Sequence, residues 1–328
     1  MPVVSFPLSE FDSHVEAMSL LSLITALLLE QLHPLSSRKY LYVWLSGYVE
    51  FFQRNFNAGQ LKQGRIAWML AIGGPLVLVI AVHFLLLHAH PIFAWAFSVL
   101  VLYLTMGFRQ FSHYYTDIHQ ALRDRQLDRA RELLGEWLGK SCSDLSHEEV
   151  ARVTIEQALL CTHRNVFGVV FWFVVLMMLG LGPVGAILYR LALFLNNRWG
   201  TQDEAEFGAF GQFARQAYHF MEWLPLRFTA ATFAIVGNFE DTIYCWRTQA
   251  ESWLDPEAGI ILASGAGALG VKLGQTIVQD QQPVFRAELG VGDEADADFM
   301  QSAIGLVWRA LVFWLFMLLL LTVANLLG

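Results

Sequence analysis

The sequence predicts an all-α, polytopic integral membrane protein with about four transmembrane helices, a broken re-entrant hairpin and a helical cytoplasmic layer. Three observations support this fold class. The chain has several long apolar runs without formal charges, its composition is 55% hydrophobic and only 15% charged, and its 21 lysines and arginines lie between those runs. Soluble domains carry about 25% charged residues. We treat residues 1–328 as a single membrane domain.

Four apolar segments are predicted to cross a bilayer, where a helix of about 20 apolar residues spans about 30 Å of hydrocarbon. The longest, Ile66 to Leu87, has 22 residues and no formal charge. No lysine or arginine precedes the first segment, which indicates a retained helix rather than a cleavable signal peptide. The predicted spans are residues 18–32, 66–87, 91–107 and 310–327.

The distribution of basic residues predicts the topology, because lysine and arginine prefer short loops on the cytoplasmic side. Residues 1–37 contain none, and neither does the link His88-Ala89-His90, so the N-terminus and this link are predicted to lie outside. The predicted cytoplasmic segments are residues 33–65, 108–165 and 196–308. This pattern is typical of a multi-pass protein of a bacterial inner (cytoplasmic) membrane.

The uncharged run Val166 to Tyr189 is interrupted by Gly180-Leu181-Gly182-Pro183, which favours two short helices over one continuous span. Residues 166–195 are therefore predicted to form a re-entrant hairpin that returns to the cytoplasmic side. Non-helical backbone at membrane depth must be satisfied by protein or by a water-filled cavity. The alternative is a full span here and a compensating span near Leu224–Val236.

The cytoplasmic segments are predicted to be helical rather than simple loops. Residues 117–139 place apolar side chains near helical spacing opposite arginines and acids. Ser146 is a candidate N-cap with Glu149 at the capping-box position, so the next helix should begin there and run through Glu156 toward the third apolar run.

Composition also excludes several classes of partner. The formal net charge of −8 argues against a nucleic-acid partner. The cysteines Cys142, Cys161 and Cys245 show no CxxC spacing, which argues against a disulfide scaffold and a structural zinc site. The lipid bilayer is the expected partner, and a homo-oligomer or a further membrane partner stays open. A transporter is a weaker hypothesis because no inverted repeat is evident.

The segment Gly265-Ala266-Gly267-Ala268-Leu269-Gly270 fits the GxGxxG pattern of a dinucleotide-binding loop. The surrounding strand–helix alternation is missing, and small residues at this density more often mark close helix packing. The packing interpretation is therefore favoured. The sequence contains no P-loop.

Two further groups of polar residues are candidates for chemistry. His83, His88, His90 and His113 offer imidazoles, but no carboxylate accompanies the His88–His90 pair, and no metal site is predicted. Charged residues at membrane depth tend to face a cavity or each other, and these are Glu30, Glu156, Arg164 and Arg190. The alternative is that Arg164 and Arg190 extend to the membrane interface.

The chain resembles the CobD/CbiB family of integral-membrane cobalamin-biosynthesis proteins. The run Gly267-Ala268-Leu269-Gly270-Val271-Lys272-Leu273-Gly274, preceded by Pro256-Glu257-Ala258-Gly259, is similar to that family's PNAGWPMAAMAGALGVRLGG stretch. Gln126 to Arg131 with Leu138-Gly139-Lys140 is similar to its GDLEAAR…VGRD region. The resemblance extends over nearly the whole chain.

This resemblance implies synthesis of the adenosylcobinamide-phosphate type, in which an amide bond joins a cobyric-acid-type corrinoid to an aminopropanol or its phosphate, with ATP and Mg²⁺ as cofactors. The chain departs from two family motifs. In ESLAENTVDGV, Glu156 is retained, but an acid, an asparagine and an aspartate are replaced by Leu160, Cys161 and Arg164. In YRAxNTLDSMxG, Asn196 replaces the aspartate and Leu193-Phe194 replaces Asn-Thr. These changes remove oxygen ligands that Mg²⁺ prefers.

The resemblance selects the candidate site residues. The catalytic candidates are Glu156, Tyr189 and Arg190. The ligand-binding candidates are Arg164, Asn196, Gly259, Gly267 and Gly270. A corrinoid or another small ligand in a membrane cavity is the implied partner.

A second hypothesis follows from a resemblance to the AmpE membrane proteins, which are associated with β-lactamase induction. The segment Trp223 to Gly237 is similar to AmpE. AmpE proteins also resemble this chain in having an arginine, here Arg164, where the CobD/CbiB motif has an aspartate. This resemblance implies a non-catalytic sensor or scaffold in a regulatory pathway.

Overall fold

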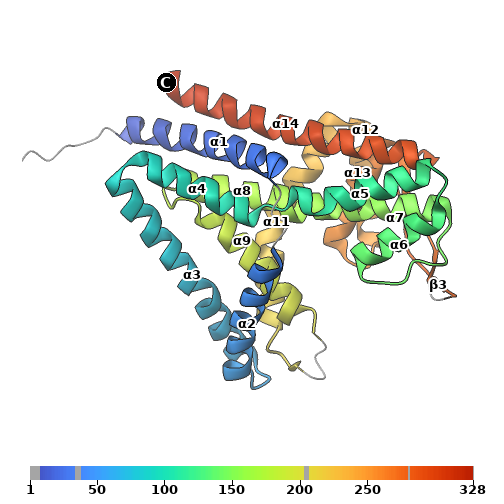
Figure 1. Ribbon diagram of the computed structural model, residues 1–328, viewed down its shortest axis with the longest axis horizontal. Coiled ribbons are helices and arrows are strands. Elements are labelled where there is room, and N and C mark those ends of the chain that lie inside the picture. The colour runs from blue at the N-terminus through green and yellow to red at the C-terminus, as the bar shows by residue number, and fades with distance from the viewer. Residues whose placement is uncertain (1–7, 34–37, 203–206, 280, 328) are drawn as a thin grey trace, which may run out of the picture. The chain divides into compact units, whose positions relative to one another are not determined.

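The computed structural model describes residues 8–33, 38–202, 207–279 and 281–327, most of them helical (Figure 1). The chain divides into two compact units. The first unit comprises residues 1–107, 168–224 and 317–328, and the second comprises residues 108–167 and 225–316.

The first unit is built from helices whose apolar residues cover most of their surfaces. The helix α3 packs against α2, α4 and α9, while α1 packs against α4 and α8. The short link between α3 and α4 is ordered by His90, whose Nδ1 accepts a hydrogen bond of 3.2 Å from the Ile92 amide. The elements are α1 (Leu8–Leu32), α2 (Arg38–Phe56), α3 (Leu61–Ala89), α4 (Pro91–Thr105), α8 (Gly168–Met178), α9 (Val184–Leu195) and the π-helical turn η2 (Asn196–Gly200).

Apolar helices long enough to cross a membrane confirm the predicted class of all-α membrane protein. Among the described residues there are three: Leu61–Ala89, His147–Met178 and Ala297–Ala324. Met18–Leu32 and Pro91–Thr105 are shorter apolar helices. Two of the predicted spans thus fall largely within long helices and two within shorter ones, and the number of crossings stays a prediction.

The helix break predicted at Gly180–Pro183 is present. Gly180 and Gly182 adopt φ of +74° and +69°, a region that favours glycine, and α9 starts directly afterwards. The helices α8 and α9 then pack side by side. A Cβ atom on Gly185 would lie 1.8 Å from the Trp172 carbonyl oxygen, so only glycine permits this approach.

The hairpin formed by α8 and α9 extends along much of α3. Its tip meets the late part of α3, where Gly182 lies against the His83 ring. At the other end, Gly64 in the first turns of α3 approaches the Phe210 carbonyl, and the Phe210 ring contacts Trp199 of η2 at 5.1 Å. The rise from Gly64 to His83 is about 28 Å at 1.5 Å per residue. This length approaches the thickness of the hydrocarbon layer, which is about 30 Å. Re-entry on one side stays a prediction.

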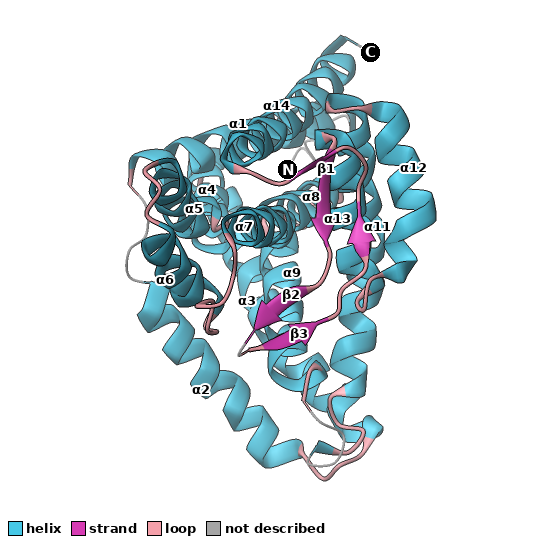
Figure 2. Cartoon of the chain, turned by 90° about the vertical axis from the view of Figure 1, so that its right-hand side faces the viewer, coloured by secondary structure: helices cyan, strands magenta, loops and turns pink. Residues whose placement is uncertain are grey.

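The second unit combines helices with short strands (Figure 2). The helices α5, α6 and α7 pack on one another, and α7 also packs on α13 and β1. The helices α11 (Gln212–Val236) and α14 (Ala297–Leu327) contribute to both units. The other helical elements are α5 (Phe108–Arg123), α6 (Leu127–Leu138), α7 (His147–Thr162), the π-helical turn η1 (His163–Phe167), α12 (Phe239–Gln249), η3 (Ala250–Ser252) and α13 (Pro256–Leu269).

The strands are absent from the sequence prediction, which expected a purely helical layer. The strand β1 pairs antiparallel with β4 and parallel with β5, and β2 pairs with β3 in a separate hairpin. The strands are β1 (Val271–Gly274), β2 (Ile277–Gln279), β3 (Gln282–Val284), β4 (Glu288–Leu289) and β5 (Asp293–Glu294). Each has four residues or fewer, so no alternating pattern marks it in the sequence.

The predicted helix start at Ser146 is confirmed. The Ser146 hydroxyl accepts from the Glu149 amide at 3.2 Å, and the Glu149 carboxylate accepts from the Ser146 amide at 2.6 Å. The amphipathic segment 117–139 is interrupted at Arg125, which has φ of +58°, so it forms the end of α5 and all of α6. Its apolar residues Ile118 and Leu134 are buried as expected.

Candidate functional site

The candidate residues are distributed over both units. Tyr189, Arg190 and Asn196 belong to the first unit. The second unit contains the remaining candidates, which are Glu156, Arg164, Gly259, Gly267 and Gly270. The expectation that charged residues such as Glu156 and Arg190 face each other therefore stays a prediction.

Glu156 joins α7 to the end of β1 within the second unit. Its side chain is buried, with 5% of the residue surface exposed. One carboxylate oxygen accepts from the Gly274 amide at 2.8 Å, and the other accepts from Arg286 Nη1 at 2.6 Å. Arg286 also donates to the carbonyl oxygens of Gly274 and Gln275, at 2.8 and 3.1 Å. Both oxygens of Glu156 are thus occupied by donors of the chain itself.

Further charges surround this pair and form what we call the β1 charge cluster. Its members are Arg152, Glu156, Lys272, Arg286, Glu288 and Glu294. The buried Arg152 donates to the Gln275 side chain at 2.5 Å and lies 3.9 Å from Glu294. Lys272 Nζ lies 3.7 Å from Glu294 and 4.0 Å from Glu288. The contacts of Lys272 with Glu288 and Glu294 connect β1 to β4 and β5, and Arg152 connects α7 to β5.

The glycine-rich segment lies inside α13, which confirms the packing interpretation. A Cβ atom on Gly267 would lie 2.5 Å from the Asp241 carbonyl of α12, and one on Gly259 would lie 2.1 Å from the Ala250 carbonyl. Gly270 ends α13 with φ of +66°. The dinucleotide-loop interpretation is wrong because such a loop precedes its helix, whereas this segment is the helix itself. A ligand role for these glycines stays a prediction.

Arg164 and Asn196 each lie in a π-helical turn, η1 and η2 respectively. Such turns are rare and frequently occur at functional sites. In η1, His163 Nδ1 lies 2.9 Å from the Thr229 hydroxyl, and Arg164 lies 3.9 Å from Asp255. In η2, the Asn196 side-chain oxygen is buried without a hydrogen-bond partner among the described residues.

The sequence interpretation missed a buried carboxylate in the first unit. Glu222 of α11 is 2% exposed. Its oxygens accept from the hydroxyls of Tyr189 and Tyr218, both at 2.8 Å. The Tyr189 ring lies against Gly168, where a Cβ atom would come within 2.2 Å of it. In the sequence, this contact is marked only by a single acid in the apolar stretch HFMEWLP, four residues after Tyr218.

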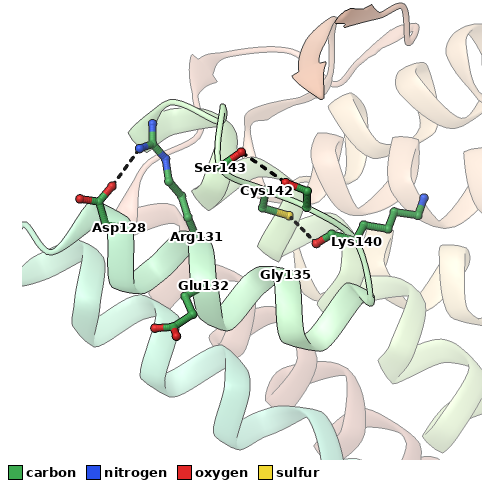
Figure 3. A pocket seen from close by; sticks show the side chains of 8 residues that line it. Asp128, Arg131, Glu132, Gly135, Lys140, Cys142 and Ser143 are labelled. Carbon is green, nitrogen blue, oxygen red and sulfur yellow. Dashed lines mark hydrogen bonds and ion pairs between the residues drawn. The ribbon is translucent and has the colours of Figure 1, made fainter. Parts of the chain in front are cut away.

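An open cavity of about 360 Å³ lies between α6 and the following loop (Figure 3). It is lined by Asp128, Arg131, Glu132, Gly135, Lys140, Ser141, Cys142 and Ser143. Arg131 donates to Asp128 at 3.0 Å and to the Leu145 carbonyl at 2.7 Å, so it stabilises the loop. Burial raises the pKa of the Cys142 thiol. Two acids and two cations line the cavity, which indicates no single class of ligand.

The candidate histidines have structural roles where their contacts are defined. His83 packs on Gly182, and His90 caps α4. Within the described part of the chain, no group of three His, Cys, Asp or Glu side chains is arranged to hold a metal ion.

Comparison with known proteins places this architecture in a family. A family model described as CobD/Cbib protein matches residues 23–307. The chain is 34% identical over 303 residues to the cobalamin biosynthesis protein CobD of Stutzerimonas stutzeri (strain A1501), covering 91% of this chain and 96% of the relative. It is 36% identical over 254 residues to CobD of Chromobacterium violaceum, covering 74% and 79%. It is 23% identical over 254 residues to the cobalamin biosynthesis protein CbiB of Salmonella typhimurium, covering 75% and 77%.

No solved structure matches the chain. The family model covers well over half of its residues, and the Stutzerimonas relative is similar over nearly its whole length. The residues that carried the sequence resemblance, from Gln126 to Gly274, all lie inside the matched range. The chain therefore belongs to the CobD/CbiB family.

Proposed function

We propose that this protein acts in cobalamin biosynthesis as a multi-pass protein of a bacterial inner membrane. Its step is the joining of a cobyric-acid-type corrinoid to an aminopropanol, or its phosphate, through an amide bond. The observation that carries the proposal is the 34% identity to a CobD protein over 91% of this chain and 96% of that relative.

The retained polar residues support a role in binding a polar substrate. Tyr189 keeps its family position and donates to the buried Glu222. Glu156 also keeps its position, and its carboxylate is oriented by Arg286 and the Gly274 amide. A buried carboxylate needs defined partners, and both Glu156 and Glu222 have them. Tyr189 and Glu156 thus each fix the position of neighbouring elements, and a substrate would bind to elements held in this way.

The residues at the altered motif positions do not fit the Mg²⁺ that ATP chemistry would need there. Mg²⁺ takes oxygen ligands, whereas Leu160 and Cys161 offer none and Arg164 carries a positive charge. The Arg164 guanidinium also lies 3.9 Å from Asp255, so this nearby carboxylate already has a positively charged partner. We therefore derive no step through magnesium or ATP at these positions.

The same replacements favour a second candidate function, a non-catalytic sensor or scaffold of the AmpE type. Such a protein would keep the fold and a ligand-binding surface without the ligase chemistry. The replacement of three polar family residues by Leu160, Cys161 and Arg164 is the observation that supports it.

Complementation separates the two candidates. The host is a bacterial strain that lacks its own CobD/CbiB protein and needs the amide-forming step to grow on cobyric acid. Rescue by this chain is expected under the first proposal. A corrinoid that already carries the aminopropanol amide serves as the growth control, and an immunoblot of the membranes verifies expression. Absence of rescue at full membrane expression, with rescue by the Stutzerimonas relative, would favour the sensor or scaffold.

A further inference from the structure

The outer face of α2 is apolar although α2 is not among the helices that are long and apolar enough to span a membrane. Val43, Trp44 and Phe51 are 62%, 66% and 59% exposed. The helix also packs inward, because Val49 is buried and the Tyr48 hydroxyl donates to the Ala71 carbonyl of α3 at 3.0 Å. A helix that packs inward and still exposes tryptophan and phenylalanine is typical of the interface between headgroups and hydrocarbon.

Two exposed arginines of the first unit lie over aromatic rings. The Arg198 guanidinium lies over the rings of Tyr42 and Phe194, at 5.6 and 5.8 Å, and donates to the Ser46 hydroxyl at 2.9 Å. The Arg65 guanidinium lies over the Phe213 ring at 5.3 Å. Stacking fixes each guanidinium while its remaining N–H groups stay available, a geometry that suits phosphate recognition.

These cations gather at one end of the first unit. Lys62 and Arg65 lie in the first turns of α3. The same end of α3 carries the contact of Gly64 with Phe210, and Phe210 contacts the η2 residue Trp199, the neighbour of Arg198. The opposite end of α3 carries His83 and the hairpin tip. The exposed cations Lys62, Arg65 and Arg198 are called the basic collar below.

We propose that the basic collar, together with the apolar face of α2, binds the headgroups of anionic phospholipids. The aromatic side chains would lie at the interface, and the guanidinium and ammonium groups would contact lipid phosphates. Charge complementarity selects the occupant, because anionic leaflets attract basic residues near the surface. The acids Asp203, Glu204 and Glu206 follow Arg198 in the sequence and lie outside the described residues. The inference does not depend on the amide-forming activity.

Native mass spectrometry of the full-length protein in detergent tests this proposal by comparing phosphatidylglycerol with phosphatidylcholine. The wild type is expected to bind phosphatidylglycerol more tightly. Each lost cation is expected to weaken that binding about fivefold, so Arg65→Gln/Arg198→Gln should weaken it about 25-fold. Binding of phosphatidylcholine should not change.

Two matched variants control for total charge and for folding. Arg123→Gln/Arg129→Gln removes two exposed cations from the second unit and should leave phosphatidylglycerol binding unchanged. Arg65→Lys/Arg198→Lys keeps the charges but loses the stacked guanidinium groups, so it should lose less affinity than the glutamine variant. Equal binding of both lipids, an equal loss in the second-unit control, or a loss in the lysine variant as large as in the glutamine variant would overturn the proposal. Displacement of the lipid by inorganic phosphate alone would also overturn it.

Discussion

Arg286 donates to Glu156 across 2.6 Å, and both side chains are largely buried. This pair connects two parts of the second unit that are far apart in the sequence, the middle of α7 and the segment between β3 and β4. The same guanidinium also binds the carbonyls at the end of β1 and lies over the Trp253 ring at 5.5 Å. Glu156, chosen from the sequence as a catalytic candidate, thus has a defined structural role.

Removing one partner of this pair should destabilise the second unit strongly. Glu156→Gln leaves the Arg286 charge buried without its carboxylate, and breaking a buried ion pair costs about 3–5 kcal/mol. A lower thermal midpoint in detergent is the expected result. Glu132→Gln, which breaks an exposed pair with Arg129, is the control and should cause no measurable change. Equal midpoints for wild type and Glu156→Gln would contradict the structural role.

Adding a methyl group to α13 should disturb its packing on α12. In Gly267→Ala, the new Cβ atom would lie 2.5 Å from the Asp241 carbonyl, so one helix must shift, and overpacking of this kind costs about 1–3 kcal/mol. Gly305→Ala is the matched control because a Cβ atom there has nothing within 4 Å. Thermal unfolding of the two variants should separate them, and equal stability would show that α12 and α13 are not in close contact.

The tyrosine pair around Glu222 should matter for stability and function. Tyr189→Phe removes the hydroxyl that donates to Glu222 at 2.8 Å, and leaving a buried acceptor without its donor costs about 1–3 kcal/mol. We expect a lower thermal midpoint and weaker growth in the complementation assay. Tyr103→Phe, which removes an exposed hydroxyl bonded to the His33 carbonyl, is the control. If Tyr189→Phe has the thermal midpoint and the complementation growth of the wild type, the contact between Tyr189 and Glu222 has no such role.

Cys245 should resist alkylation in the folded protein. Burial, reinforced by the nearby Asp241 carboxylate, raises the pKa of its thiol to about 11, whereas an unfolded cysteine has a pKa of about 8.5. The neutral thiol therefore stabilises the fold fully below about pH 8.5, and this contribution is lost as pH rises toward the folded pKa. In a Cys142→Ser/Cys161→Ser background, maleimide labelling at pH 7 should be slow until denaturant is added. Fast labelling of the folded protein would contradict the assigned burial.

The hairpin tip should be accessible from the side opposite to the start of α3. Leu179 next to the tip is 68% exposed, and the tip meets the late part of α3 at His83. In a cysteine-free background, Leu179→Cys should react with a membrane-impermeant maleimide added to intact cells. Asn57→Cys, before the start of α3, should react only after the membrane is opened. Labelling of both from the same side would show that the hairpin does not extend across the bilayer.

Apolar pattern and capping chemistry made much of the fold predictable. The run Ile66–Leu87, the break at Gly180–Pro183 and the cap at Ser146 are local features, and the structure contains each of them. The strands and the Tyr189–Glu222 contact depend on residues that are distant in sequence. Tyr189 and Glu222 are 33 positions apart, and no periodicity connects them. Lys272, within the family-like run, acquires its acidic neighbours only when β4 and β5 pair with β1.

The two π-helical turns affect how this chain can vary. A π turn holds one residue more than the α-helix around it, and each α-helical residue advances the helix by about 100°. Deleting one residue from η1 would convert it into a regular α-helical turn and would leave the α8 face with Gly168 against Tyr189. The turn can thus absorb a one-residue change in length that would rotate a regular α-helix by about 100°. Point replacements such as Arg164 and Asn196 leave the spacing of the helix unchanged.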